Sequence, residues 1–466
     1  MGAGFHIENF GCRAARADGE AIADRLRAAG HCMKPLPDAD VVVVNTCSVT
    51  AEADREARAY IRRARRANPQ ARIVATGCYA QRAPEELAAL DGVAAVVGNS
   101  HKALAPEIVM GLAAGRESAS GLVPVASIAG PLVLANELFA HSFLEEAQVV
   151  PGAQTRPNLK IQEGCGNRCS FCVIPQTRGS SRSLPRAAVL RQVEGFITAG
   201  GRELVLSGIN LGRWGRDLEP TETLAGLVRR IFEQTALQRL RLSSIEPMDW
   251  DAELIGLMKQ FGGTRLARHA HLPLQSGSDA VLRRMYRRYR PWHYADKVSA
   301  LMQAAGPELT LGADVMVGFP GETDAEFEET LELVRALPFG YLHLFPFSPR
   351  PGTRAWALHA ERPVPMRPVE DRMAALRKLG AEKTRAHRSA LIGRELEAIT
   401  LHTPAVLAAA GRTVALAENF VPVDLEGRFD SNQLVRVRAT GLTAEGTLTA
   451  SLAAAEYAPP ALVTTG

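Results

Sequence analysis

Three cysteines close together in the sequence are the residues best suited to chemistry in this chain. They occupy the run Cys165-Gly-Asn-Arg-Cys169-Ser-Phe-Cys172, with the spacing Cys-x3-Cys-x2-Cys. Cysteine thiolates are the usual ligands of iron–sulfur clusters, and a cluster with four irons normally takes four of them. A loop that supplies only three thiolates therefore leaves one iron open to a ligand from outside the protein.

A structural zinc loop is the alternative interpretation of the same cysteines. Structural zinc sites take four protein ligands, usually in two separated pairs, and no histidine lies near this loop to complete such a set. The spacing instead resembles the signature of the radical S-adenosylmethionine (SAM) enzymes. That resemblance implies that the open iron binds the amino and carboxylate groups of SAM. It also implies that an electron from the cluster cleaves SAM to a 5′-deoxyadenosyl radical.

Three further cysteines in the first hundred residues each follow a predicted strand directly. They are Cys12, Cys47 and Cys78. Right-handed βαβ connections keep the carboxyl ends of parallel strands on one edge of a sheet, where ligands bind in open α/β folds. The three thiols can therefore converge on a second cluster, although any one of them alone could be a small buried apolar residue. Cys32 follows a predicted helix at the opposite edge, and we expect it to be an ordinary buried cysteine.

Length and composition indicate a globular protein of several domains. The chain has 466 residues, of which 46% are hydrophobic and 22% charged, and this length suggests about three domains. The N-terminus has no basic-then-apolar signal peptide, and no apolar stretch is long enough to span a membrane. We therefore expect a cytoplasmic protein without a membrane partner, in which clustered cysteines are metal ligands and not disulfides.

Alternating strand and helix patterns position these cysteines. Residues 1–105 have the pattern of a doubly wound α/β domain, in which the apolar, β-branched run 41–44 is a buried parallel strand. Residues 106–154 have weak periodicity and are predicted to be a linker. Residues 155–385 repeat strand then helix six times, which predicts a partial (βα)6 barrel resembling a TIM barrel, with its chemistry at the carboxyl ends of the strands.

Five short strands in residues 386–455 predict a small closed β-barrel of the OB-like kind that often binds RNA. A docking domain without any ligand is the alternative for this segment. Arginines also crowd two predicted helices, near residues 55–66 and 283–290. Such runs fit a surface that contacts phosphates, and they fit ordinary solvated helix faces equally well.

Taken together, the motifs resemble those of the radical SAM methylthiotransferases over residues 10–452. The motifs that carry the resemblance are Gly11-Cys12-Arg13, Asn45-Thr46-Cys47, Gly77-Cys78-Tyr79-Ala80-Gln81, the segment from Gln162-Glu163-Gly164-Cys165 to Thr177-Arg178-Gly179, and Asn419-Phe420. The resemblance identifies residues 1–105 as the methylthiotransferase N-terminal domain and residues 155–385 as the radical SAM domain. Residues 386–455 then correspond to TRAM, the tRNA-binding β-barrel of this family.

The resemblance implies two 4Fe-4S clusters with SAM as cosubstrate. The cluster on Cys165, Cys169 and Cys172 would generate the radical, and the cluster on the three N-terminal cysteines would carry the sulfur that is methylated and transferred. General acid–base catalysis cannot open the unactivated C–H bond at carbon 2 of adenine, so the cofactors carry this reaction. The SAM ligands are expected to be the Phe171 backbone, Gly208, Gln275 and Gly318. The reaction also needs tRNA, a sulfur source and an electron donor such as flavodoxin or ferredoxin.

Three branches of the family differ in substrate. They modify N6-threonylcarbamoyladenosine in tRNA, N6-isopentenyladenosine in tRNA, or an aspartate of a ribosomal protein. The motif that begins at Asn45-Thr46-Cys47 and the run Phe345-Pro346-Phe347-Ser348-Pro349-Arg350-Pro351-Gly352-Thr353 most resemble the threonylcarbamoyl branch, whose target is position 37 beside the anticodon. Ala15 and Pro175-Gln176-Thr177 depart from the family pattern.

Two further hypotheses use the same cysteines differently. One is an RNA-binding protein whose clusters are purely structural, which predicts that the reduced protein does not cleave SAM. The other is a simpler radical SAM methylase with a single cluster, which predicts about four irons per chain where two clusters predict about eight. The sequence leaves the oligomeric state open.

Overall fold

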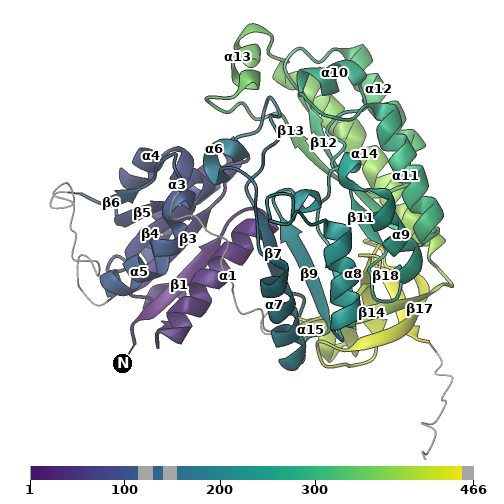
Figure 1. Cartoon of the computed structure of the whole chain (residues 1–466), viewed down its shortest axis with the longest axis horizontal. Helices are drawn as coiled ribbons and strands as arrows, with labels where there is room; N and C mark the ends of the chain where they lie inside the picture. Colours follow the sequence, from purple (N-terminus) through teal and green to yellow (C-terminus); the bar gives the residue numbers. More distant parts are fainter. Residues whose placement is uncertain (1, 114–129, 140–154, 454–466) are drawn as a thin grey trace, which may run out of the picture.

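The computed structural model of the chain describes residues 2–113, 130–139 and 155–453. These residues form three parts, an N-terminal sheet, a large barrel and a small C-terminal barrel, which follow one another along the sequence (Figure 1). Much of the predicted linker 106–154 therefore lies outside the described residues. The described residues of this segment include most of helix α5 (Ala105–Ala113) and strand β6 (Leu132–Leu134). Strand β6 adds an edge strand to the N-terminal sheet. No helix of the described chain is long and apolar enough to cross a membrane.

The first part is a parallel sheet covered by helices on both faces. Its strands run in the order β2-β1-β3-β4-β5-β6, and every neighbouring pair is parallel. Besides β6, the strands are β1 (Gly4–Asn9), β2 (Cys32–Met33), β3 (Val41–Thr46), β4 (Arg72–Gly77) and β5 (Val93–Gly98). The helices are α1 (Arg13–Ala28), α2 (Ala51–Ala67), α3 (Cys78–Arg82), α4 (Pro84–Ala88) and α5. The doubly wound fold predicted from the sequence is confirmed.

The valine run in β3 explains how this sheet is held. Successive side chains of a strand point to opposite faces, so Val42 and Val44 pack with the side chains of α2 and α3, whereas Val41 and Val43 pack with those of α1 and α5. All four valines are buried. Because both faces bury apolar surface, β3 is fixed at the centre of the sheet, and the loop that carries Cys47 starts from a rigid strand.

The second part is an incomplete barrel of six parallel strands surrounded by helices. Two ladders make up its wall, β10-β9-β7-β8 and β11-β12-β13, and residues Leu240 and Leu266 form a parallel bridge beside β10. The strands are β7 (Asn158–Glu163), the short antiparallel β8 (Arg182–Ser183), β9 (Glu203–Gly208), β10 (Arg239–Leu242), β11 (His269–His271), β12 (Thr310–Val317) and β13 (Phe339–Pro346). The partial barrel predicted from six strand–helix repeats is confirmed.

Helices lie between the strands of this part and after the last of them. They are α6 (Ile174–Arg178), α7 (Arg186–Thr198), α8 (Leu224–Gln234), α9 (Ala252–Phe261), α10 (Asp279–Arg284), α11 (Pro291–Ala305), α12 (Asp324–Ala336), α13 (Arg354–Glu361) and α14 (Met366–Ala390). At the start of α12, Thr323 and Glu326 form a reciprocal capping box, which satisfies two backbone N–H groups that the helix itself leaves unpaired. That cap fixes where the loop after β12 ends.

The third part is a closed five-stranded β-barrel, as predicted. Its order is β14-β15-β16-β18-β17, and β17 returns to pair with β14. The elements are β14 (Glu395–Thr400), α15 (Ala405–Ala409), β15 (Arg412–Ala417), β16 (Pro422–Glu426), β17 (Leu434–Leu442) and β18 (Leu448–Leu452). Phe420 joins it to the larger barrel, because its ring lies 4.5 Å from that of His269 and 5.8 Å from that of Tyr341.

Cys32 corrects one expectation from the sequence. It lies on the short strand β2 at the edge of the N-terminal sheet and is exposed, not buried. An edge strand of two residues has too little covering structure to bury a side chain, and its two residues are too few to form a recognisable pattern.

Candidate functional site

The loops after β1, β3 and β4 bring the three N-terminal cysteines to one edge of the sheet. Cys12 precedes α1, Cys47 follows β3, and Cys78 is the first residue of α3. Gly11 has φ +99°, and a Cβ atom at this position would lie only 2.7 Å from Sγ of Cys47. The glycine is therefore required both by its backbone conformation and by the close approach of the two loops.

Two thiols of this first triad, those of Cys47 and Cys78, are buried, whereas Cys12 is exposed. Burial is the main reason that the pKa of Cys47 rises to about 12, and the neighbouring Cys78 and Cys12 raise it further. Two side chains donate hydrogen bonds to Cys78 Sγ, Arg178 Nε at 3.2 Å and Asn99 Nδ2 at 3.5 Å. These two donors therefore face the sulfur of a candidate metal ligand.

The second triad lies in the loop that follows β7. The backbone N–H of Cys165 donates to the Gly179 carbonyl at 3.1 Å, which anchors the start of the loop. Cys165 Sγ accepts hydrogen bonds from the backbone of Asn167 and from Asn210 Nδ2, both at 3.4 Å. Burial raises the pKa of Cys165, and these two donors oppose the shift. Asn210 lies just beyond β9, so two neighbouring strand ends meet at this sulfur.

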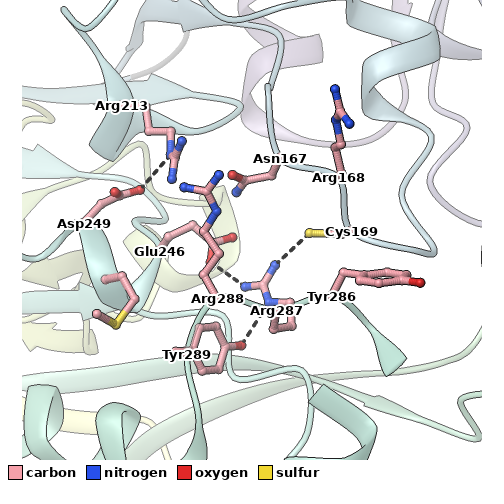
Figure 2. A pocket seen from close by; sticks show the side chains of 11 residues that line it. Asn167, Arg168, Cys169, Arg213, Glu246, Asp249, Tyr286, Arg287, Arg288 and Tyr289 are labelled. Atoms are coloured by element: carbon pink, nitrogen blue, oxygen red, sulfur yellow. Dashed lines mark hydrogen bonds and ion pairs between the residues drawn. The ribbon is translucent and has the colours of Figure 1, made fainter. Parts of the chain in front are cut away.

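Arg287 faces the second triad as Arg178 faces the first. Its Nη1 atom lies 3.4 Å from Cys169 Sγ, and its Nη2 atom donates to Glu246 at 2.5 Å. Figure 2 shows the Arg287 guanidinium between Glu246 and Cys169, at one side of a polar pocket whose wall also includes Asp249. Arg287 is 7% exposed, so water screens its charge poorly and the interaction with the sulfur is strong.

Cys172 completes the second triad from the far end of the loop. The pKa of its thiol is raised to about 12, mainly by burial and secondly by the neighbouring Cys169. Its backbone N–H donates to the Cys169 carbonyl at 3.2 Å, which closes a tight turn between the last two cysteines. Burial therefore disfavours the free thiolates of Cys47, Cys165 and Cys172, and a metal that binds them has to displace their protons.

The spacing of the thiols fits a cluster better than a single ion. Sulfur atoms around one tetrahedral zinc, with Zn–S bonds of about 2.3 Å, lie about 3.8 Å apart. Neither triad has all three Sγ atoms within even 4.8 Å of one another, although all six cysteines lie in the described part of the chain. A 4Fe-4S cluster places its cysteine sulfurs on separate irons and needs this wider arrangement. The donor set and its width therefore fit the group that the sequence predicts.

Five buried charged side chains join the first triad to the barrel. Arg178 Nη1 pairs with Glu163 Oε1 at 2.7 Å and with Asp18 Oδ2 at 3.0 Å. Lys102 Nζ pairs with the same two carboxylates at 2.6 and 3.2 Å, and Lys160 also pairs with both. Burial opposes ionisation of Asp18 and Glu163, but the cations outweigh it and lower both pKa values.

This charged cluster places a guanidinium beside the first triad. Three basic side chains face two carboxylates, and burial lowers the pKa of one of them, Lys102. Arg178, which is 1% exposed, turns its Nε atom to Cys78, where positive charge stabilises negative sulfur. Asp18 belongs to α1 and Glu163 to β7, so the cluster also holds the N-terminal domain against the barrel.

The four residues predicted to bind SAM lie at the carboxyl ends of the barrel strands. Gly208 ends β9, and the ring of Phe171 in the cysteine loop packs edge-on against Phe319 after β12, with 6.5 Å between centroids. Gln275 lies beside β12 and adopts φ +62°. The N–H of Gly318 is used within the fold, donating to Glu322 at 2.8 Å. These four residues therefore lie on the same face of the barrel as the second triad.

Several residues that contact the thiols have no local sequence signal for this role. They are Arg178, Asn99, Asn210 and Arg287, which reach the sulfurs only through the packing of separate elements. The arginine run 283–290 also divides in the structure. Arg284 pairs with Glu326 in a bidentate contact, whereas Arg287 is buried beside Cys169. Arg283 and Arg288 of the same run are exposed, so the run does not act as one surface.

Comparison with known proteins finds two matching families. Residues 4–98 match an uncharacterized protein family, UPF0004, and residues 159–334 match the radical SAM superfamily. The first match covers the sheet that carries Cys12, Cys47 and Cys78, and the second covers the barrel that carries the other triad.

Curated relatives match over almost the whole chain. The threonylcarbamoyladenosine tRNA methylthiotransferase MtaB of Aquifex aeolicus is 34% identical over 92% of this chain and 98% of its own length. The corresponding protein of Bacillus subtilis is 38% identical over 75% of this chain and 74% of its own length. A tRNA-2-methylthio-N(6)-dimethylallyladenosine synthase of Cereibacter sphaeroides is 33% identical over 93% of this chain and 95% of its own length.

A solved structure shares the fold. The radical SAM methyltransferase TsrM of Kitasatospora setae superposes with a TM-score of 0.55 at 16% identity, and the match covers 78% of each chain. At this identity the similarity concerns the fold alone.

Proposed function

The chain belongs to the radical SAM methylthiotransferases, and from this membership we propose that it adds a methylthio group to carbon 2 of N6-threonylcarbamoyladenosine at position 37 of tRNA. Relatives named for this substrate reach 38% identity, and those named for the dimethylallyl substrate reach 35%. The motifs after Cys47 and around Arg350 favour the same branch.

The observation that carries the proposal is the pair of three-thiol sites, each beside one buried arginine. We assign one 4Fe-4S cluster to Cys12, Cys47 and Cys78, and another to the cysteines of the loop after β7. In each site three ligands leave one position open. When bound, the clusters and SAM supply the one-electron chemistry, the sulfur and the methyl group, and the protein supplies binding, orientation and exclusion of water.

Named side chains perform those protein roles. Arg178 and Asn99 donate hydrogen bonds to Cys78, and Arg287 donates to Cys169. Hydrogen bonds and positive charge at a sulfur ligand stabilise the more negative state of a cluster and so raise its reduction potential. The buried cluster of Arg178, Lys102, Lys160, Asp18 and Glu163 keeps the two domains in a fixed relative position, which transfer between two sites requires.

For SAM we propose the barrel face around the second triad. The Phe171 backbone, Gly208, Gln275 and Gly318 are the proposed contacts. Gln275 Oε1 is buried and has no hydrogen-bond partner among the described residues, so it can accept a donor from a ligand there. Because the N–H of Gly318 is already bound to Glu322, this residue offers close backbone approach and a carbonyl oxygen, but no free donor.

For tRNA we propose contacts from two basic surfaces. The closed β-barrel presents the exposed Arg394, Arg436 and Arg438. The solvent face of α2 presents Arg62 and others of the first arginine run. An electron donor such as flavodoxin or ferredoxin, and a sulfur source, complete the proposed reaction.

Mass spectrometry of tRNA nucleosides tests the substrate. In a strain that lacks the gene, we expect 2-methylthio-N6-threonylcarbamoyladenosine to disappear and its unmethylthiolated precursor to accumulate. Wild-type gene on a plasmid should restore the product, and a Cys47→Ala gene should not. Loss of the isopentenyl analogue instead would assign the chain to the other tRNA branch, and unchanged tRNA would point to the ribosomal-protein branch.

A further inference from the structure

Two histidines and an aspartate converge on the wall of the large barrel, and none of them contacts a cysteine. His271 ends β11, Asp314 lies in β12 and His343 lies in β13. Asp314 is paired directly with His343, and His271 is paired with Gly312, two residues before Asp314. Since residues two apart in a strand share a face, the parallel register places all three side chains on the same side of the wall.

The ligand nitrogens of both histidines lie close to one carboxylate oxygen, at separations that fit a shared ion. His271 Nε2 is 3.1 Å and His343 Nδ1 is 3.2 Å from the same oxygen, Asp314 Oδ1. All three ligand atoms lie within 4.8 Å of one another, and no other such group occurs in the described part of the chain. Ligands 2.0–2.1 Å from a common ion are separated by roughly 2.9 to 3.4 Å in octahedral or tetrahedral geometry.

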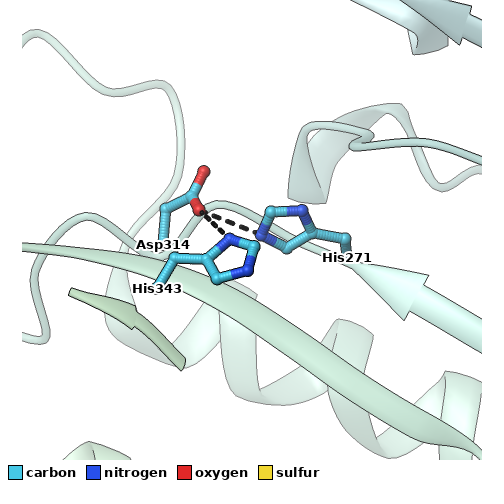
Figure 3. Close-up of side chains that lie close together, drawn as sticks. All are labelled: His271, Asp314 and His343. Carbon is cyan, nitrogen blue, oxygen red and sulfur yellow. Dashed lines mark hydrogen bonds and ion pairs between the residues drawn. The ribbon is translucent and has the colours of Figure 1, made fainter. Parts of the chain in front are cut away.

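Figure 3 shows that both imidazole rings direct a nitrogen to that carboxylate oxygen. The rings are steeply inclined to each other, with centroids 5.2 Å apart and an interplanar angle of 82°. His271 Nε2 is buried and forms no hydrogen bond of good geometry with any described residue, despite the short distance to Asp314. A nitrogen so placed has a lone pair to offer when the ring is neutral.

The environment suits a cation that is reached from one side. The side chain of His271 is 12% exposed, that of Asp314 25% and that of His343 59%, so one edge of the group is open to water or to a further ligand.

We propose that His271, Asp314 and His343 form a binding site for one divalent transition-metal ion of the zinc class. Two imidazoles and one carboxylate are borderline ligands that suit zinc, iron(II), cobalt(II) or nickel(II), and a three-residue set leaves positions open for water or a substrate oxygen. The ion would fix the relative position of three neighbouring strands of the barrel. This proposal does not depend on the proposed function, because no residue of the group contacts either thiol triad.

Zinc uptake by the reconstituted protein tests the proposal. The full chain, with its cysteine sites filled by iron and sulfide under anaerobic conditions, is dialysed against low micromolar zinc, and zinc and iron are both measured. We expect about one zinc per chain for the wild type, without loss of iron. Asp314→Asn and His271→Gln should weaken zinc binding by more than the roughly tenfold that removing a hydrogen-bond partner of a ligand costs. His402→Gln, which removes an exposed histidine elsewhere, should bind zinc as the wild type does.

Zinc K-edge X-ray absorption of the wild-type protein gives a second readout that needs no variant. The proposal expects nitrogen and oxygen neighbours at about 2.0–2.1 Å and none at the Zn–S distance of about 2.3 Å. Sulfur neighbours, or release of iron as zinc enters, would place the zinc on the cysteines and overturn the proposal. Equal zinc content in the wild type and Asp314→Asn would overturn it as well, leaving the group as a carboxylate hydrogen-bonded by two histidines.

Discussion

Arg178 Nε lies 3.2 Å from Cys78 Sγ, although 100 positions separate the two residues and they belong to different domains. The same guanidinium pairs with Asp18 of the N-terminal domain and Glu163 of the barrel. One side chain therefore contacts a proposed cluster ligand and also holds together the two domains whose sites must cooperate. A change at this arginine should affect the first triad and leave the second intact.

Arg178→Gln should lower the iron content of the reconstituted protein from about eight to about four per chain. The variant removes the cation beside Cys78, but Lys102 and Lys160 still neutralise Asp18 and Glu163, so the chain should fold. Arg178→Lys should recover iron only in part, because lysine keeps the charge and lacks the planar fork that contacts sulfur and carboxylates together. Iron and sulfide analysis with electron paramagnetic resonance measures the result.

The matched control for this prediction is Arg186→Gln, which removes an exposed arginine paired with Glu222. It should keep about eight irons. Were Arg178→Gln to retain the full iron content and an unchanged spectrum, the contact with Cys78 would have no part in holding a cluster.

Replacing each cysteine triad in turn should separate the two halves of the reaction. With Cys12, Cys47 and Cys78 changed to Ala, the reduced protein should still cleave SAM but should form no methylthiolated tRNA. With the cysteines of the second triad changed, SAM cleavage should stop as well. Each variant should hold about four irons, and 5′-deoxyadenosine is measured by chromatography. Loss of SAM cleavage in the first variant would contradict the proposed division of roles.

The raised thiol pKa values predict that the metal-free chain loses stability in alkali. The pKa of Cys47 is about 12 in the folded chain, against an ordinary value of 9.0. From about pH 9 to 12 the unfolded thiol has lost its proton while the folded one keeps it, so the free energy of unfolding falls as pH rises. The loss is at most about 1.4 kcal/mol per pH unit for each such thiol.

Urea unfolding of the metal-free protein at pH 8, 9 and 10, followed by circular dichroism, checks this dependence. Cys47→Ala removes one of the responsible thiols, so the fall with pH should be shallower than in the wild type. The Cys32→Ala variant serves as the control, because this thiol is exposed. Parallel curves for the wild type and Cys47→Ala would show that burial does not protect the Cys47 proton.

The sequence was sufficient to predict elements whose apolar pattern is continuous. Residues 41–44 are recognisable as a buried strand, and the six strand–helix repeats as a partial barrel. The apolar residues that an element buries recur at regular positions along its own sequence, so the pattern indicates which face is buried. Cys12, Cys47 and Cys78 could be grouped because parallel topology fixes which strand ends share an edge.

Contacts that depend on how separate elements meet could not be predicted in the same way. The partners of Arg178 are decided by the docking of α1 against β7 and of α3 against α6, which no local pattern encodes. His271, Asp314 and His343 come from three different strands, and only the register between those strands brings them together. The burial expected for Cys32 was wrong because a strand of two residues has no periodicity.

Asp54 forms a second contact between the N-terminal domain and the barrel, through an ion pair with Arg350. Its Oδ2 atom pairs with Arg350 at 2.6 Å and with Arg82 at 2.9 Å, and all three side chains are largely buried. Asp54→Asn should leave two buried cations without a charged partner, at a cost of about 3–5 kcal/mol. We expect faster hydrogen exchange and proteolysis at this interface. Asp24→Asn, which breaks a more exposed pair with Arg27, should change neither.

The solvent face of α2 offers the last prediction. Arg62, Arg63 and Arg66 are exposed there, and no carboxylate partner of theirs occurs among the described residues. If they contact tRNA phosphates, changing all three to Gln should weaken tRNA binding. It should also reduce the slope of log K against log salt by about 0.7–0.9 for each phosphate that the helix no longer neutralises. Fluorescence anisotropy at several salt concentrations measures both quantities.

The control for α2 removes exposed arginines that already have partners. Arg229 and Arg230 pair with Glu253 and Glu233 on the outside of the barrel, so Arg229→Gln with Arg230→Gln should leave affinity and salt slope nearly unchanged. The comparison distinguishes a local phosphate contact from a general effect of net charge, because only a local contact depends on which arginines are removed. An equal decrease in affinity per charge in both variants would mean that α2 faces solvent in the complex, and tRNA contacts would then have to come from the closed β-barrel.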